Sequence, residues 1–175
     1  MKKTLICLML LGLIIGGSGF ASAAVQKGDT TLTFDLAFTN TETDYGTFDR
    51  NLTGRVALGR FLTDNFQLEG ILSGVTGEME DGALDYTYGA FLLRPNFHFA
   101  TETATVPYIG AAAGIFHIEM GSASETSFIY GGQVGLKQFI RDNVFLQMEA
   151  SYLMTEVEGT DMDIFKILVG LGFKL

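Results

Sequence analysis

The side chains of this chain that could take part in catalysis are two histidines and the acidic and hydroxyl groups near them. A hydrolase needs a serine within reach of a histidine that an acid orients. His117 has Glu119, Ser122 and Ser124 close by in the sequence, but this segment is expected to lie partly in a loop. Structural roles are the favoured interpretation for His98 and His117. We therefore predict no catalytic residue, no cofactor and no metal site, and expect that the chain is not an enzyme.

Cysteine and charge content limit the remaining chemistry. Cys7 is the only cysteine, and it lies in an amino-terminal segment that we expect to be removed. The mature chain would then have neither a disulfide nor a cysteine-based metal site. Without Lys2 and Lys3 the chain keeps 9 basic and 20 acidic residues, a net charge of −11. This surplus of acid argues against nucleic-acid binding, because phosphate recognition needs an excess of Lys and Arg.

The amino-terminal segment has the three parts of a secretory signal peptide. Two lysines precede an apolar run from Leu5 to Ile15, and Ala-Ser-Ala ends the segment at Ala23. The run is short for a membrane helix, and glycines interrupt it. We expect cleavage after Ala23, which makes residues 1–23 a signal peptide and residues 24–175 one domain.

The rest of the chain alternates between apolar and small or polar residues, which predicts β-strands. Hydrophobic residues make up 47% of the sequence, yet after the signal no apolar run is long enough for a membrane helix. The alternation is less clean in the two middle segments, where glycine and alanine occupy both faces. The expected strands are residues 31–39, 55–62, 66–73, 88–99, 107–118, 128–139, 144–155 and 165–175.

The length of these segments favours a membrane barrel over a soluble sandwich. Several alternate for 9 to 13 residues, whereas a tilted strand needs about 9–11 residues to cross a bilayer and soluble strands average about 5–6. In a membrane barrel the apolar face contacts lipid and the other face points into the lumen. In a sandwich the apolar faces would instead meet in a core, with the polar faces in water.

The non-apolar face carries both acidic and basic residues. Lys or Arg placed on lipid at mid-membrane would cost about 2–4 kcal/mol each, so we predict that these charges lie in a filled lumen and neutralise one another. Only Arg60 falls on the lipid-facing side, near a strand end from which it can reach the interface. The predicted lumen charge network, with a structural role, consists of Asp35, Arg55, Glu69, Arg94, Lys137, Glu149 and Lys166.

The breaks between strands form two alternating sets. Residues 63–65 and 140–143 are predicted tight turns containing Asp-Asn, whose side chains bond the local backbone and of which Asn tolerates positive φ. Residues 100–106 form a somewhat longer turn. The other breaks, expected to be loops of about 7–11 residues, fall near residues 40–50, 76–84, 119–126 and 156–162. The simplest topology joins the strands as up-and-down hairpins.

The second set of connections should face the outside of the cell, because an even strand number leaves both termini on the periplasmic side. Arg50 is the only base in these connections. Weak binding of Ca²⁺ or Mg²⁺ shared with lipopolysaccharide is one interpretation, but no loop has the spacing of a calcium loop, so solvation and repulsion are favoured. The acids of these connections are Glu42, Asp44, Asp49, Glu78, Glu80, Asp81, Glu119, Glu125, Glu156, Glu158 and Asp161.

These features together resemble the small bacterial outer-membrane barrel family, which includes the transmembrane domain of outer membrane protein A and the opacity-type surface proteins. The resemblance rests on the signal peptide, the eight alternating segments, the Asp-Asn turns, the Pro-Tyr-Ile-Gly-Ala segment at 107–111 and the terminal residues 169–175. It covers nearly the whole mature chain and is one of pattern. The family usually ends in an aromatic residue that the barrel-assembly machinery recognises. Here the end is Leu175, with Phe173 two residues before it.

We therefore expect an all-β, eight-stranded, antiparallel up-and-down transmembrane barrel in the bacterial outer membrane, with a structural or surface-interaction role. Its expected partners are outer-membrane lipid, lipopolysaccharide and the barrel-assembly machinery. Eight strands leave room in the lumen only for side chains, so no large pore is expected. A soluble secreted or periplasmic barrel that binds an apolar ligand is the first alternative, and an outer-membrane lipid hydrolase is the second.

Overall fold

The computed structural model describes residues 25–43, 46–78, 85–120, 123–157 and 159–175. The predicted signal peptide lies outside the described residues. No helix among the described residues is long and apolar enough to cross a membrane. The structure consists of eight strands: β1 (Thr30–Thr43), β2 (Gly46–Phe61), β3 (Phe66–Glu78), β4 (Asp85–His98), β5 (Thr105–Met120), β6 (Ala123–Arg141), β7 (Val144–Val157) and β8 (Thr160–Lys174).

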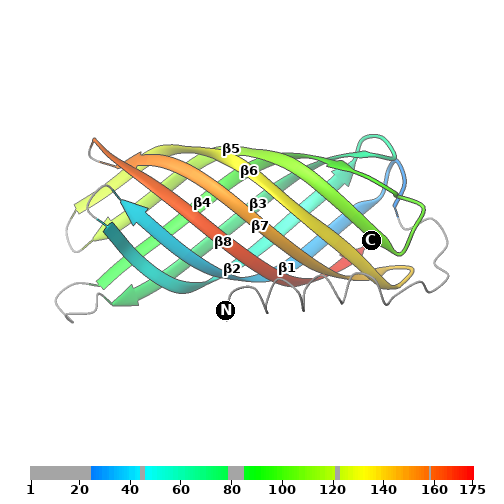
Figure 1. The fold of residues 1–175 in the computed structure, drawn as a ribbon, viewed down its shortest axis with the longest axis horizontal. Helices are drawn as coiled ribbons and strands as arrows, with labels where there is room; N and C mark the ends of the chain where they lie inside the picture. The colour runs from blue at the N-terminus through cyan, green and yellow to red at the C-terminus, as the bar shows by residue number, and fades with distance from the viewer. Residues whose placement is uncertain (1–24, 44–45, 79–84, 121–122, 158) are drawn as a thin grey trace, which may run out of the picture.

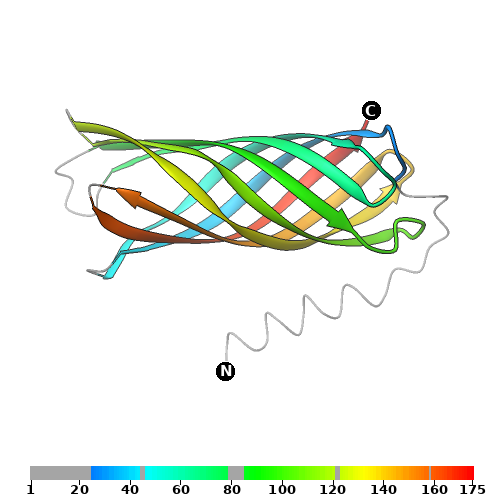
Figure 2. The ribbon, with the colours of Figure 1, turned by 90° about the horizontal axis from the view of Figure 1, so that it is seen from above.

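The eight strands form one closed antiparallel barrel in sequence order. β1 closes the barrel by pairing with β8 as well as with β2, for example through Phe34 with Leu171 and with Val56. The strands are strongly tilted relative to the long axis (Figure 1), and the view turned by 90° shows the same tilt around the barrel (Figure 2). The predicted fold class and the up-and-down topology are therefore confirmed.

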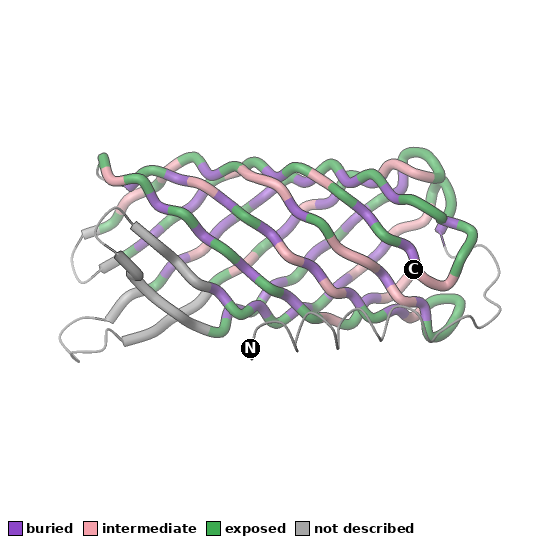
Figure 3. Tube along the Cα trace, viewed as in Figure 1, coloured by how far each residue is buried: buried purple, intermediate pink, exposed green. Residues whose placement is uncertain are grey.

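The two faces of each strand point where the alternation predicts. On β1, Phe34 and Leu36 are 50% and 59% exposed, whereas Thr33 and Asp35 between them are 0% and 4% exposed. Buried and exposed residues alternate in the same way along the other strands (Figure 3). Many large apolar side chains thus cover the outside of the barrel, whereas the charged residues of the predicted network lie inside, together with other apolar side chains. This arrangement contradicts the soluble alternative, which would place the apolar side chains around a central cavity.

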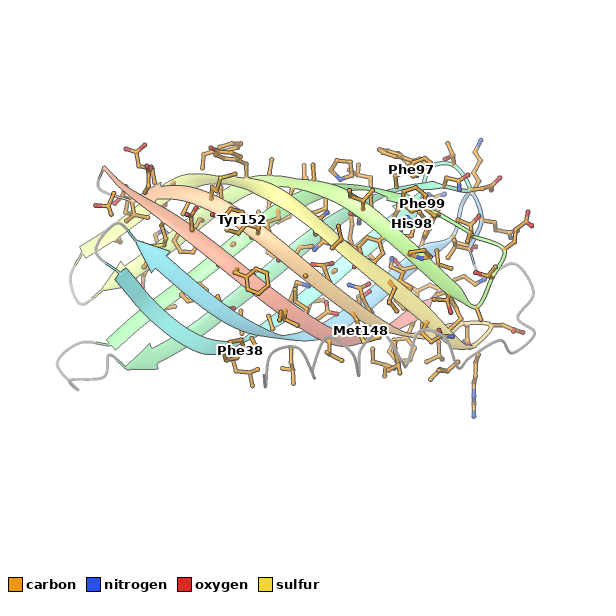
Figure 4. All side chains as sticks on the ribbon, viewed as in Figure 1. Phe38, Phe97, His98, Phe99, Met148 and Tyr152 are labelled. Atoms are coloured by element: carbon orange, nitrogen blue, oxygen red, sulfur yellow. The ribbon has the colours of Figure 1, made fainter. Side chains whose placement is uncertain are left out.

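Aromatic side chains gather on the outside near both ends of the barrel, as at the interfaces of a membrane barrel. Phe97 and Phe99, whose ring centroids lie 5.2 Å apart, mark one end, and Phe128 and Tyr130, 6.0 Å apart, mark the other. Tyr152 is also exposed on the outer face (Figure 4). The exposed surface is therefore an apolar belt with aromatic pairs toward both of its ends, and Phe91 lies within it.

One end of the barrel, called here the turn end, holds the tight turns, the start of β1 and the end of β8. Leu175 bonds there to the Thr30 carbonyl, and Lys174 bonds to the Asn143 carbonyl. At the first turn, the Thr63 hydroxyl accepts hydrogen bonds from the backbone N–H groups of Asn65 (3.3 Å) and Phe66 (3.0 Å). The Asp-Asn turns are therefore confirmed as turns, although the second is shorter than the predicted 140–143, because β6 continues to Arg141 and β7 begins at Val144.

The backbone of the two Asp-Asn turns nevertheless differs from the positive-φ conformation that their asparagines could have adopted. Ala100 (φ 50°) is the only non-glycine residue with positive φ in the described part of the chain, so neither Asn65 nor Asn143 uses the left-handed conformation. The side-chain contacts of Thr63 stabilise the first turn without it. The predicted turn at 100–106 is shorter, because β4 ends at His98 and β5 begins at Thr105.

The opposite end, called here the hairpin end, corrects the sequence-based loop boundaries. Strand pairing reaches Thr43 with Gly46, Glu78 with Asp85, and Met120 with Ala123. Most of residues 40–50, 119–126 and 156–162, predicted as loops, therefore belong to strands. Alternation could not reveal this, because beyond the bilayer both faces of a strand meet water and backbone pairing continues without an apolar face.

Candidate functional site

The lumen contains a continuous series of ion pairs. Arg55 donates to Asp35 and to Glu149, each at 2.7 Å. Arg94 donates to both carboxylate oxygens of Glu149 and lies 3.4 Å from Glu69. The series Asp35–Arg55–Glu149–Arg94–Glu69, called here the ion-pair chain, thus joins five of the seven residues predicted to form the charge network.

Strand register explains how the ion-pair chain is assembled. Asp35 and Arg55 are direct partners on β1 and β2, and Glu69 and Arg94 are direct partners on β3 and β4. Glu149 comes from β7 and reaches across the lumen to both arginines. Since all five residues are at most 7% exposed, these ion pairs are screened little by solvent, and losing one partner would leave a buried charge uncompensated.

Glu149 is the centre of this arrangement. Besides the two arginines, the Tyr108 hydroxyl donates to its Oε2 atom at 2.6 Å. A carboxylate that accepts bonds from two guanidinium groups and a phenol is held as an anion and is not free to transfer a proton or attack a substrate. The chemistry of this site is therefore charge compensation and cross-linking of strands.

The two lysines of the predicted network lie outside the ion-pair chain. Lys137 donates to the Gln67 amide oxygen at 2.8 Å, and its ammonium lies 5.3–5.7 Å from the ring centroids of Phe61, Tyr108 and Phe145. Its direct contacts are thus an amide and aromatic faces, and no acid among the described residues forms an ion pair with it. Lys166 is buried in the lumen and has neither a hydrogen bond nor an ion pair with any described residue.

The lumen is filled by apolar side chains on both sides of the charged layer. The turn-end plug, defined as Val25, Phe61, Val106, Phe139 and Phe145, closes one side with side chains that are at most 5% exposed. A larger apolar cluster, the hairpin-end plug, fills the other side. It comprises Ala57, Ile71, Tyr88, Ala90, Leu92, Ala112, Phe116, Ile118, Ile129, Leu153, Val157, Met162 and Ile164.

The two histidines have different environments. His98 is fully buried, with its ring 4.8 Å from that of Phe61 and 5.2 Å from that of Tyr108. His117 is exposed on the outer face of β5, where it contacts the Thr126 hydroxyl at 2.7 Å and Glu119 at 3.1 Å. In the described part of the chain neither histidine contacts a serine, as a hydrolase would require.

The acids predicted at the outer rim lie at the hairpin end where they are described. Four of them have described side chains and are called here the rim acids: Glu119, Glu125, Glu156 and Asp161. Glu125 is partly buried and the other three are exposed. No group of three or more His, Cys, Asp or Glu residues within the described ranges is placed to hold a metal ion.

Sequence reasoning missed several polar members of the lumen. Tyr108 bonds Glu149, Gln67 holds Lys137, and Asn96 contacts both Glu69 (3.3 Å) and Gln133 (2.7 Å). All of them occupy lumen-facing positions of the alternation. Including uncharged polar residues of that face in the predicted network would have found them.

Comparison with known proteins agrees with this architecture. No protein-family model matches the sequence, and no curated protein matches it. Among solved structures, the chain is similar to Neisserial surface protein A, with a TM-score of 0.74 and 17% identity over 83% of this chain and 97% of that one. It is also similar to the attachment invasion locus protein Ail of Yersinia pestis (TM-score 0.58, 17% identity, 85% and 99% coverage). A third is the outer membrane protein OprG of Pseudomonas aeruginosa (TM-score 0.59, 12% identity, 89% and 99% coverage).

At these levels of identity the likeness establishes the fold. The chain has the eight-stranded barrel fold of small bacterial outer-membrane proteins, and its apolar outer belt is the surface that such a barrel presents to lipid.

Proposed function

We propose that this outer-membrane barrel has a structural or surface-interaction role, and that it neither conducts solutes nor catalyses a reaction. The observation that supports this most is the filling of the lumen. Apolar plugs lie on both sides of the ion-pair chain, and eight strands enclose only enough space for side chains. The surfaces that remain available are the apolar belt and the rim at the hairpin end.

Two experiments test this proposal. Cell fractionation combined with a heat-modifiable gel shift should place the protein in the outer membrane as a folded barrel. Recordings in planar lipid bilayers should show no discrete conductance steps for the purified barrel. Large, reproducible single-channel steps would contradict the closed lumen. A recording with Phe145→Ala, which shortens a central side chain of the turn-end plug, shows whether the assay detects a loosened lumen.

The proposed partners follow from the same surfaces. Lipid contacts the apolar belt, lipopolysaccharide surrounds the rim, and the barrel-assembly machinery would receive the chain during insertion through its terminal segment, residues 169–175. Mg²⁺ or Ca²⁺ could link the rim acids to lipopolysaccharide phosphates, because both ions prefer oxygen ligands.

Lipopolysaccharide retention tests the cation-linked contact. The amount that copurifies with the barrel in mild detergent should fall when a chelator replaces Mg²⁺. It should also fall when all four rim acids are changed to their amides. Equal retention under all these conditions would show that the rim acids only interact with solvent.

The proposed lack of enzymatic activity also has a direct test. A lipid A mass spectrum from cells that express the wild-type protein should match that from cells expressing His117→Ala. A modified lipid A species that disappears in the variant would support the hydrolase alternative. The observed contacts of His117 with Thr126 and Glu119 support a structural role for this side chain.

A further inference from the structure

A small cavity lies in the lumen beside the ion-pair chain. Its volume is about 20 Å³, enough for one water-sized or halide-sized species. Three cationic side chains line it, from Arg55, Arg94 and Lys166, and the hydroxyls of Ser73 and Ser151 also line it. None of the lining residues is acidic. The cavity is therefore small and interior, with cationic and hydroxyl groups, the Gln133 amide and several apolar side chains in its wall.

Several of the hydrogen-bond donors in this wall have no acceptor among the described residues. The Nη2 atom of Arg55 and the Nε atom of Arg94 are buried and unpaired, and Lys166 has no described hydrogen-bond or ion-pair partner. Buried donors normally find an acceptor, and a buried ammonium without one is costly. The cavity is the space that these groups share.

The charges of the predicted network indicate whether a species bound in the cavity should be neutral or negative. It contains four bases, Arg55, Arg94, Lys137 and Lys166, and three acids, Asp35, Glu69 and Glu149. The ion pairs of these acids are all with the two arginines. One formal positive charge is therefore uncompensated, and Lys166, at the cavity, is the base with no described partner. A neutral water would accept hydrogen bonds but would leave this charge in place.

We propose that the cavity binds one monovalent anion of halide size, such as chloride, held by Lys166 and the two guanidinium groups with help from the hydroxyls of Ser73 and Ser151. Because apolar plugs lie on both sides, the ion enters while the barrel folds. The site is thus a structural counter-ion site built into the filled lumen.

Crystallography with bromide tests the site directly. The barrel is refolded in detergent with sodium bromide, so that the anion can be incorporated during folding, and is crystallised in the same salt. Anomalous diffraction at the bromine edge should show one peak in the cavity for the wild-type protein and no peak there for Lys166→Met. The absence of a peak in the wild-type cavity, or an equal peak in the variant, would overturn the proposal.

A stability measurement gives an independent test that does not depend on the folding of Lys166→Met. Ser151 is the direct strand partner of Lys166 and lines the cavity, so Ser151→Asp supplies a fixed anion at the same place. The wild-type barrel refolded in sodium chloride should unfold at a higher urea concentration than the barrel refolded in sodium gluconate of equal ionic strength. Ser151→Asp should unfold at the same concentration in both salts.

The matched control is Ser124→Asp, which adds the same charge at an exposed position on β6 and should keep the full difference between the two salts. Equal midpoints for the wild-type barrel in chloride and gluconate would contradict the proposal. An undiminished salt difference in Ser151→Asp would contradict it as well.

Discussion

Arg94 and Glu149, which lie on strands β4 and β7, form a bidentate pair across the lumen. Nη1 donates to Oε1 at 2.8 Å and Nη2 donates to Oε2 at 2.5 Å. Since Arg55 binds the same carboxylate from β2, Glu149 links three strands that are not neighbours in the barrel. Its removal would leave two buried guanidinium groups close together without their shared counter-charge.

Replacing Glu149 with Gln should therefore destabilise the barrel by about 3–5 kcal/mol, the usual cost of removing one partner of a buried ion pair. The free energy of unfolding can be measured by urea titration in detergent, with the heat-modifiable gel shift as the readout. Glu156→Gln, on the exposed face of the same strand, is the matched control and should change the stability by less than about 0.5 kcal/mol. A similar small effect in both variants would show that the ion-pair chain contributes little.

Replacing Lys137 should cost less stability than replacing Glu149, because the contacts of its ammonium are an amide and three aromatic rings and include no acid. Lys137→Met removes the cost of burying a charge but leaves the Gln67 oxygen unpaired, at about 1–3 kcal/mol. The double variant Lys137→Met with Gln67→Leu removes both polar groups, although the buried Thr31 hydroxyl loses the bond that the Gln67 amide donates to it, and it should be more stable than Lys137→Met alone. A loss of 3 kcal/mol or more in the double variant would mean that the lysine charge itself is needed.

The contrast between these residues shows how far the sequence could predict the interior. Alternation predicted correctly that Asp35, Glu69, Lys137 and Glu149 face the lumen, because the side of a strand depends only on local parity. It could not predict that Glu149 forms ion pairs with two arginines, nor that Lys166 forms no ion pair with an acid among the described residues. That choice depends on which strands face each other across the lumen and on their stagger, and both are set by barrel closure.

An arginine placed on the apolar belt should destabilise the barrel more at the middle of the membrane than near its edge. Leu72 is 64% exposed in the middle of the outer face of β3, whereas Leu62 is 46% exposed at the turn end, two residues after Arg60. Leu72→Arg should destabilise the barrel in lipid vesicles by about 2–4 kcal/mol and Leu62→Arg by about 0–1 kcal/mol. Urea titration in vesicles measures both values. Equal costs for the two variants would show that β3 does not cross the hydrocarbon at this depth.

Glycines on the lumen face predict where larger side chains cannot be accepted. A Cβ atom on Gly172 would overlap the ring of Phe145, the fully buried phenylalanine of the turn-end plug. Phe145 is the direct partner of Gly172 between β7 and β8, so the ring lies over the glycine and neither strand can move away without losing its pairing. Gly172→Ala should therefore destabilise the barrel by about 1–3 kcal/mol through overpacking.

Gly54→Ala is the control for this substitution, because a Cβ atom there meets nothing within 4 Å. It should leave the stability unchanged or raise it slightly, since alanine restricts the unfolded chain more than glycine does. The double variant Gly172→Ala with Phe145→Leu should recover part of the loss, because a smaller side chain vacates the space that the new methyl group needs. Urea titration of the wild-type protein and these three variants measures the stabilities. If the double variant recovers nothing, the stability lost in Gly172→Ala does not come from the contact between residues 145 and 172.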